Sequence, residues 1–261
     1  MEQMKTFILG LGSQKCGTTS ITGLLKKAGV IFPFGNEAHI LNKCFKPRYN
    51  FPKSAGKVKN KLFIDPWDYA QIFNKHSGEE RFVGDFTPAY CTLSIAELTY
   101  TRKILKEEGF KIKTIFIARD PFKRCWSAAR MNLGNNYLNE GGSIKAAHKW
   151  FKKQMLSERY QARTKYEEVI TNIEKTFERN EIYIGIFEQI FSGNILHNLN
   201  PLFKYLELEP PTKLIKVKDS SELKLAEPIQ HKKAFQKHYR NTYEFMGEKF
   251  PITREAWAMP E

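Results

Sequence analysis

The chain has 261 residues, of which 42 are lysine or arginine and 28 are aspartate or glutamate, so its formal net charge is +14. Hydrophobic residues make up 41% and charged residues 27%, a composition that excludes wholesale disorder, collagen and coiled coil. The apolar runs are far shorter than the roughly 20 residues of a membrane-spanning helix, and the N-terminus lacks the features of a signal peptide. We therefore expect a soluble, cytoplasmic protein whose positive charge indicates an anionic partner.

Strands and helices alternate along the chain. A short buried strand is predicted at Lys5–Leu11, and a helix with apolar residues at helical spacing begins near Thr18 and ends before Gly29. The other predicted strands are Arg81–Phe86, Ile112–Ala118 and Ile182–Phe187. The other predicted helices are Pro66–Lys75, Ser94–Glu108, one that begins at Pro121, a long stretch at Ser143–Phe177, Asn194–Leu206 and Lys232–Lys249.

This alternation predicts an α/β protein with three layers, in which helices cover both faces of a mostly parallel central sheet. We expect the helices of the last third to pack against that sheet. Ligands of such sheets bind beyond the carboxyl ends of the strands. The segments that follow the strands ending near Leu11, Phe86 and Ala118 are therefore where a functional site is expected.

The segment after the first strand has the character of a phosphate-binding loop. It runs from Gly12 to Ser20 and opens a helix, so its glycines and the helix N-terminus can present backbone N–H groups to an anion. The spacing of Gly12 and Gly17 is that of a nucleoside-triphosphate loop, but Thr18 occupies the position of its lysine. The lysine of this chain is Lys15, inside the loop. A plain turn that caps a helix is the alternative interpretation.

A second candidate anion site follows the strand at Ile112–Ala118. Arg119 stands at the end of this strand, and Ser127 lies eight residues further on, about two turns into the next helix. A guanidinium and a hydroxyl form a suitable receptor for one terminal phosphate. By itself, the pair is equally compatible with a surface ion pair and a helix start at Asp120-Pro121.

Taken together, the two segments resemble the sulfotransferases that use 3′-phosphoadenosine 5′-phosphosulfate (PAPS). In that family, a K-x-G-T-[ST] loop holds the 5′-phosphosulfate and a later R-x7-S holds the 3′-phosphate, and both patterns occur here about a hundred residues apart. The chain looks most like the branch that includes heparan sulfate sulfotransferases and related bacterial enzymes. The resemblance implies the P-loop-like sulfotransferase fold in a single domain over residues 1–261. It also implies that PAPS is bound by Lys15, Cys16, Gly17, Thr18, Thr19, Ser20, Arg119 and Ser127.

Two further segments resemble the acceptor side of the same family. Residues Glu37–Asn42 resemble its E-x-H-x-F-[DN] segment, which implies that Glu37 is the base that deprotonates the acceptor, with His39 orienting the acceptor or sharing the proton. Residues Gly84–Tyr90 resemble its E-K-[ST]-P-x-Y segment, although Phe86 replaces the lysine, and Gln14 replaces an arginine of the heparan sulfate branch. Weaker C-terminal likenesses are Phe187-Glu188, Tyr239-Arg240, Tyr243, Gly247 and Phe250.

The implied reaction is an in-line displacement in which adenosine 3′,5′-bisphosphate leaves the sulfuryl group. The protein then mainly positions groups and neutralises charge. Lys15 can stabilise the oxygen that bridges phosphate and sulfate as the bond to that oxygen breaks. No metal is expected, because the donor carries less charge than a triphosphate and the four cysteines lack metal-ligand spacing.

The acceptor is left open between a hydroxylated or amino small molecule and a polysaccharide. The segment Lys43–Lys61 contains seven basic and no acidic residues, which suits an anionic glycan as well as a solvated loop. We also expect Lys216–Lys224 to close over the nucleotide. The alternatives are a P-loop kinase or triphosphatase, which would need ATP and Mg²⁺, and a non-enzymatic nucleic-acid-binding protein, for which no recognised motif is present. We expect neither a nucleic acid partner nor a membrane span.

Overall fold

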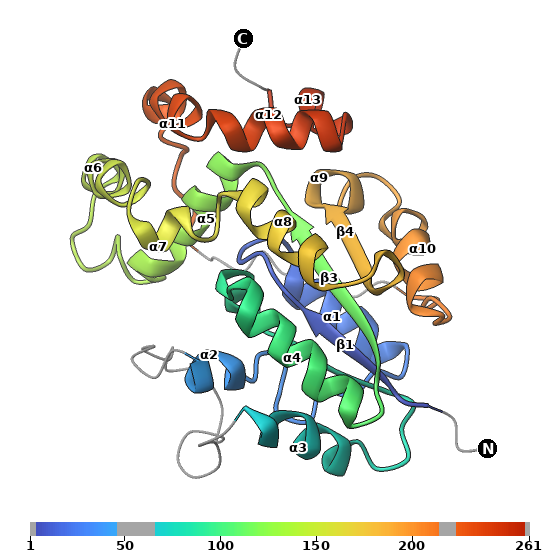
Figure 1. Ribbon diagram of the computed structural model, residues 1–261. Coiled ribbons are helices and arrows are strands. Elements are labelled where there is room, and N and C mark those ends of the chain that lie inside the picture. The colour runs from blue at the N-terminus through green and yellow to red at the C-terminus, as the bar shows by residue number, and fades with distance from the viewer. Residues whose placement is uncertain (1–3, 46–65, 214–222, 259–261) are drawn as a thin grey trace.

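The computed structural model describes residues 4–45, 66–213 and 223–258. Within these ranges the sheet has four strands, β1 (Thr6–Gly10), β2 (Phe82–Phe86), β3 (Lys111–Ala118) and β4 (Ile182–Ile186). All neighbouring strands are parallel and their order is β2-β1-β3-β4 (Figure 1). The carboxyl ends of the four strands therefore meet at one edge of the sheet.

Helices cover both faces of this sheet, because its strands point alternate side chains to opposite faces. In β1, Phe7 and Leu9 belong to one hydrophobic cluster and Ile8 belongs to the other. The first cluster includes residues of α3 (Trp67–Ser77), α4 (Ile95–Glu107) and α8 (Tyr166–Thr176). The second includes residues of α1 (Thr18–Lys27) and α10 (Ile195–Leu206). The predicted three-layer α/β/α architecture is confirmed.

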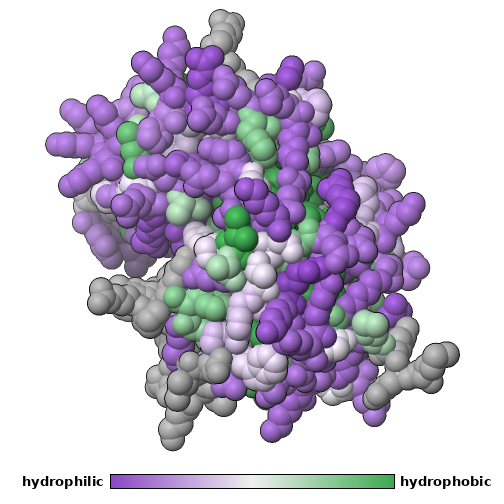
Figure 2. Space-filling model, in the orientation of Figure 1, coloured by the Kyte–Doolittle hydropathy of each residue, from purple (hydrophilic) through white to green (hydrophobic). Residues whose placement is uncertain are grey.

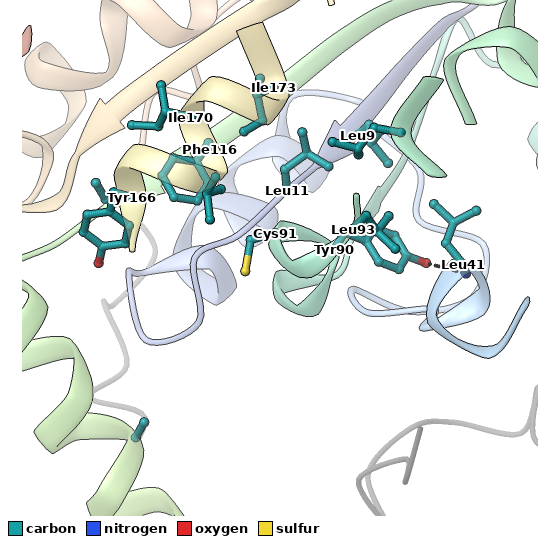
Figure 3. Packing of buried hydrophobic residues seen from close by; sticks show 14 of the residues in the cluster. Leu9, Leu11, Leu41, Tyr90, Cys91, Leu93, Phe116, Tyr166, Ile170 and Ile173 are labelled. Atoms are coloured by element: carbon teal, nitrogen blue, oxygen red, sulfur yellow. Dashed lines mark hydrogen bonds between the residues drawn. The ribbon is translucent and has the colours of Figure 1, made fainter. Parts of the chain in front are cut away.

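Figure 3 shows how the first cluster fills the space between the sheet and its covering helices. Leu9 of β1, Leu11 just after it and Phe116 of β3 belong to this cluster together with Ile170 and Ile173 of α8. All five side chains are at most 2% exposed. Burying side chains of this size stabilises a fold by about 1.5–3 kcal/mol each, so this packing fixes β1 and β3, whose carboxyl ends carry the candidate site.

Two predicted helical stretches are wrong as single helices. The stretch at 143–177 is divided into α6 (Ile144–Gln154), α7 (Glu158–Gln161) and α8. The break before α8 contains Thr164, whose fully buried hydroxyl accepts a hydrogen bond from the guanidinium of Arg124, a contact that a continuous helix would not require. The stretch at 232–249 is divided into α11 (Lys232–His238) and α12 (Arg240–Lys249).

The division of the last stretch has a similar cause. Tyr239, between α11 and α12, is buried, and its hydroxyl donates to the carbonyl oxygen of Met155 at 2.7 Å. Helix α10 packs on the sheet as expected, whereas α11 contacts α5 (Pro121–Leu133) and α12 contacts α8 (Figure 1). The remaining helices of the described part of the chain are α2 (Ile40–Phe45), α9 (Phe187–Ile190), α13 (Ile252–Ala256) and the 3₁₀ helices η2 (Pro88–Thr92), η3 (Arg179–Glu181) and η4 (Ile229–His231).

The surface in Figure 2 is predominantly hydrophilic. Helix α6 illustrates why, because its inner face buries Ala147 and Phe151 while its outer face carries four exposed lysines. These are Lys145, Lys149, Lys152 and Lys153. No helix in the described ranges is long and apolar enough to cross a membrane.

Candidate active site

The first residues of the loop between β1 and α1 continue the hydrogen bonding with β3 before the chain turns. The amide of Leu11 donates to the carbonyl of Ile115 at 2.8 Å, and the amide of Ser13 donates to that of Ile117 at 3.0 Å. The loop is thereby anchored to β3 at the carboxyl edge of the sheet. Gly17 then begins α1 with a left-handed backbone (φ 77°) and offers no side-chain cap. A helix N-terminus without a side-chain cap is a favourable place for an anion, although the amide of Ser20 already donates to the carbonyl of Gly17 at 3.0 Å.

Two glycines of this loop are required by close contacts as well as by their backbone angles. A Cβ atom on Gly17 would lie 2.4 Å from Cε2 of Phe191, and one on Gly12 would lie 2.7 Å from the carbonyl oxygen of Pro88. Both glycines have positive φ, which side chains disfavour. The loop is therefore pressed against α9 and the segment that follows it on one side and against η2 on the other.

Arg119, the residue that follows β3, forms a hydrogen bond with this loop. Its Nη1 donates to the carbonyl oxygen of Lys15 at 3.0 Å, and its guanidinium lies 4.3 Å from the ring centre of Phe187. The hydroxyl of Tyr166 donates to the Arg119 carbonyl at 2.9 Å and fixes the backbone there. The Nε of Arg119 is buried and has no hydrogen-bond partner among the described residues. The two motifs predicted to bind one nucleotide therefore touch each other.

The other predicted donor-side residues differ in how their side chains are placed. The thiol of Cys16 is fully buried in the cluster beneath α1, and burial raises its pKa to about 12. Cys16 therefore stays a neutral thiol, and the group that it can offer to an anion is its backbone amide. Thr18 and Ser20 are buried and Thr19 is exposed. Ser127 lies on α5 and is 4% exposed.

Glu37 and His39 form a pair at the neighbouring strand end. The Nε2 atom of His39 lies 3.1 Å from Oε2 of Glu37. The His39 side chain is 5% exposed and that of Glu37 is 43% exposed, so the histidine supports a carboxylate that solvent can reach. The preceding segment runs along β2, where the amide of Phe86 donates to the carbonyl of Asn36 at 3.0 Å. This pairing carries Glu37 to the same sheet edge as the phosphate loop.

Sequence reasoning missed the role of Asp85, a carboxylate at the end of β2. It is 0% exposed and accepts hydrogen bonds from the hydroxyls of Tyr69, Thr87 and Tyr90 and from the amide of Ala38. Burial raises the pKa of Asp85. The residue lies in the segment matched to the family's acceptor cleft, but no spacing rule indicates that the hydroxyls of Thr87, Tyr90 and the more distant Tyr69 converge on it.

The weak C-terminal likeness at Phe187-Glu188 also belongs to the site. The guanidinium of Arg119 packs over the ring of Phe187. The carboxylate of Glu188 accepts hydrogen bonds from the amide of Asp120 at 3.1 Å and from the indole N–H of Trp257 at 2.8 Å. Tyr243 donates its hydroxyl to the Asp120 carboxylate at 3.2 Å. These contacts fix the start of α5, on which Ser127 lies. The predicted lid at 216–224 and the basic segment at 43–61 fall largely outside the described residues.

Comparisons with known proteins concern the fold. No protein-family model matches the sequence, and a search of curated proteins finds no match. Among solved structures, a sulfotransferase from Alicyclobacillus acidocaldarius is similar, with a TM-score of 0.65 and 17% identity over 97% of this chain and 99% of that one. The sulfotransferase domain from the curacin biosynthetic pathway has a TM-score of 0.52 and 14% identity over 94% and 91% of the two chains. This chain has the sulfotransferase fold.

Proposed function

We propose that this protein transfers a sulfuryl group from PAPS to a hydroxyl or amine of a small-molecule or polysaccharide acceptor. The observation that carries the proposal is the hydrogen bond from Arg119 to the carbonyl of Lys15. It joins the two segments that the family uses for the two ends of one nucleotide. A triphosphate loop would need a lysine where this chain has Thr18.

The donor side fits a nucleotide with two separate anionic groups. The amides of the phosphate loop and of the first turn of α1 would hold the 5′-phosphosulfate. The buried Nε of Arg119, which lacks a partner within the described ranges, would donate to the 3′-phosphate together with the hydroxyl of Ser127. Lys15 would donate to the oxygen that bridges phosphorus and sulfur as the sulfur–oxygen bond breaks.

The acceptor side would supply the base. Glu37 would take the proton of the acceptor while the new bond forms between the acceptor atom and sulfur, and adenosine 3′,5′-bisphosphate would leave on the opposite side. His39, when its Nε2 carries the proton, donates to Glu37 and holds the carboxylate in one orientation. These steps use no metal ion.

The test is thermal unfolding of the protein with adenosine 3′,5′-bisphosphate, compared with ATP and Mg²⁺. A ligand at 100 times its dissociation constant adds about 2.7 kcal/mol to the free energy of unfolding. We expect stabilisation by the bisphosphate alone, lost in Lys15→Ala and Arg119→Ala. Matched controls are Lys27→Ala and Arg179→Ala, which remove exposed cations elsewhere. Stabilisation by ATP with Mg²⁺ and none by the bisphosphate would refute the proposal in favour of a kinase.

A further inference from the structure

The loop that carries Glu37 and His39 is held by side chains from the end of β2 and from the segment that follows it. The amide of Ala38 donates to Oδ1 of Asp85 at 3.3 Å, and the amide of His39 donates to the Thr87 hydroxyl at 3.2 Å. The amide of Leu41 donates to the Tyr90 hydroxyl at 3.3 Å, as Figure 3 shows. Three amides within four residues are thus fixed by side chains rather than by a strand or helix ladder.

Asp85 sets the direction of these hydrogen bonds. The Thr87 hydroxyl donates to its Oδ1 and the Tyr90 hydroxyl donates to its Oδ2, each at 2.6 Å. Because a carboxylate only accepts, each hydroxyl must point its hydrogen at Asp85 and keep a lone pair for the amide of His39 or Leu41. An asparagine in the same place could donate to one hydroxyl and reverse its direction.

The loop also needs such support for its backbone. His39 has a left-handed conformation, with φ of 57°, although it is not a glycine. A residue in such a conformation is strained and persists only where its surroundings over-determine it. The Thr87 hydroxyl accepts a hydrogen bond from the amide of this strained residue and so helps to hold its conformation.

We propose that Asp85, acting through Thr87 and Tyr90, is the positioning residue that holds Glu37 and His39 in their reactive geometry. The proposal rests on the proposed function, in which Glu37 is the base. Its supporting observation is that a fully buried carboxylate has no arginine or lysine partner among the described residues and is compensated by hydroxyls and an amide instead. Burial raises the pKa of this carboxyl, which means that its ionised form is destabilised in the core. Packing alone would not require a carboxyl at this position.

Two tyrosines provide a matched pair of variants. The hydroxyls of Tyr69 and Tyr90 both donate to Oδ2 of Asp85, and both side chains are 0% exposed. Only Tyr90 also accepts an amide of the loop. Tyr69→Phe and Tyr90→Phe therefore remove the same interaction with the carboxylate, but only Tyr90→Phe releases the loop. Thr87→Val, which releases the amide of His39, is a second test should Tyr90→Phe fail to fold.

The primary measurement is hydrogen–deuterium exchange of the amides at 38–41 in the intact protein. We expect exchange about fivefold faster in Tyr90→Phe than in the parent, and unchanged in Tyr69→Phe, because one hydrogen bond contributes about 1 kcal/mol. Turnover of PAPS with water as the acceptor should fall in Tyr90→Phe, while the dissociation constant of adenosine 3′,5′-bisphosphate stays within about twofold.

The outcomes separate this proposal from the proposed function. Equal exchange and equal turnover in the two tyrosine variants would overturn the positioning role of Asp85. Loss of bisphosphate affinity in Tyr90→Phe would also overturn it, because the network would then support the fold in general. If the parent protein does not bind the bisphosphate, the proposed function fails, whereas the exchange contrast still decides whether Asp85 holds the loop.

Discussion

The donor side and the acceptor side of the candidate site are built by different means. The phosphate loop is fixed by backbone hydrogen bonds to β3 and by glycines pressed against neighbouring atoms. The loop with Glu37 and His39 is fixed by side chains gathered around the buried carboxylate of Asp85. A backbone-built site suits a ligand that is always the same, such as a nucleotide, whereas a side-chain-built site can change with a few substitutions.

The two sides meet at η2. The carbonyl of Pro88 lies against Gly12 of the phosphate loop, and the preceding residue, Thr87, accepts the amide of His39. The adjacent residues Thr87 and Pro88 therefore link the position of the phosphate loop to that of the loop with Glu37. The predictions below separate the contributions of the two sides, beginning with the largest expected effect.

Replacement of Glu37 by glutamine should affect the acceptor side alone. A positioned base contributes about 10²–10⁴-fold to a rate, so PAPS turnover should fall by that factor. Affinity for the bisphosphate should be unchanged, because the donor side is held by separate contacts. Turnover is measured as release of adenosine 3′,5′-bisphosphate, and Glu79→Gln, an exposed carboxylate, is the control. Parent-like turnover in Glu37→Gln would remove Glu37 from the mechanism.

Replacement of Gly17 by alanine should affect the donor side. The left-handed backbone alone costs an alanine about 1–2 kcal/mol, and its Cβ would lie 2.4 Å from Phe191. The matched control is Gly29→Ala, which has a similar φ of 89° but no atom within 4 Å of the added Cβ. Both variants should unfold at lower temperature, and only Gly17→Ala should also weaken bisphosphate binding. Equal binding by the two would mean that the contact with Phe191 does not shape the loop.

The sequence predicts the donor side well because its determinants are local. Gly12, Lys15 and Gly17 follow a strand at fixed spacing, and the parallel order of β1 and β3 brings Arg119 to the same edge. The acceptor side depends on contacts between positions far apart, such as Tyr69 with Asp85 and Leu41 with Tyr90. Local patterns also predict two helices that are longer than those observed. Each of them is interrupted where Thr164 or Tyr239 is buried and hydrogen-bonded in the core.

The pH dependence of stability should reveal the carboxylate of the acceptor side. Burial raises the pKa of Asp85 above its ordinary value of 3.8, so Asp85 keeps its proton to a higher pH in the folded protein than in the unfolded chain. The stability that this preference contributes is present below about pH 4 and is lost as the pH rises through the folded pKa. Asp85→Asn should remove this loss, which amounts to at most about 1.4 kcal/mol per pH unit.

The measurement for Asp85→Asn is the free energy of unfolding in urea between pH 4 and pH 8. The difference between variant and parent should shift in favour of the variant as the pH rises. A constant difference over this range would show that Asp85 titrates alike in the folded and unfolded protein. Glu80→Gln, at an exposed position, provides the baseline.

The smallest effect concerns the thiols. Cys16 lies in the phosphate loop, and burial raises the pKa of its thiol to about 12, which keeps the thiol neutral at pH 8. Iodoacetamide should therefore modify the half-buried Cys44 and spare Cys16, Cys91 and Cys125 in the folded protein, while all four react in urea, as intact mass will show. Rapid modification of Cys16 would mean that the phosphate loop opens. In that case the bisphosphate should slow the reaction at Cys16 and leave Cys44 unaffected, because only the donor side would close over the ligand.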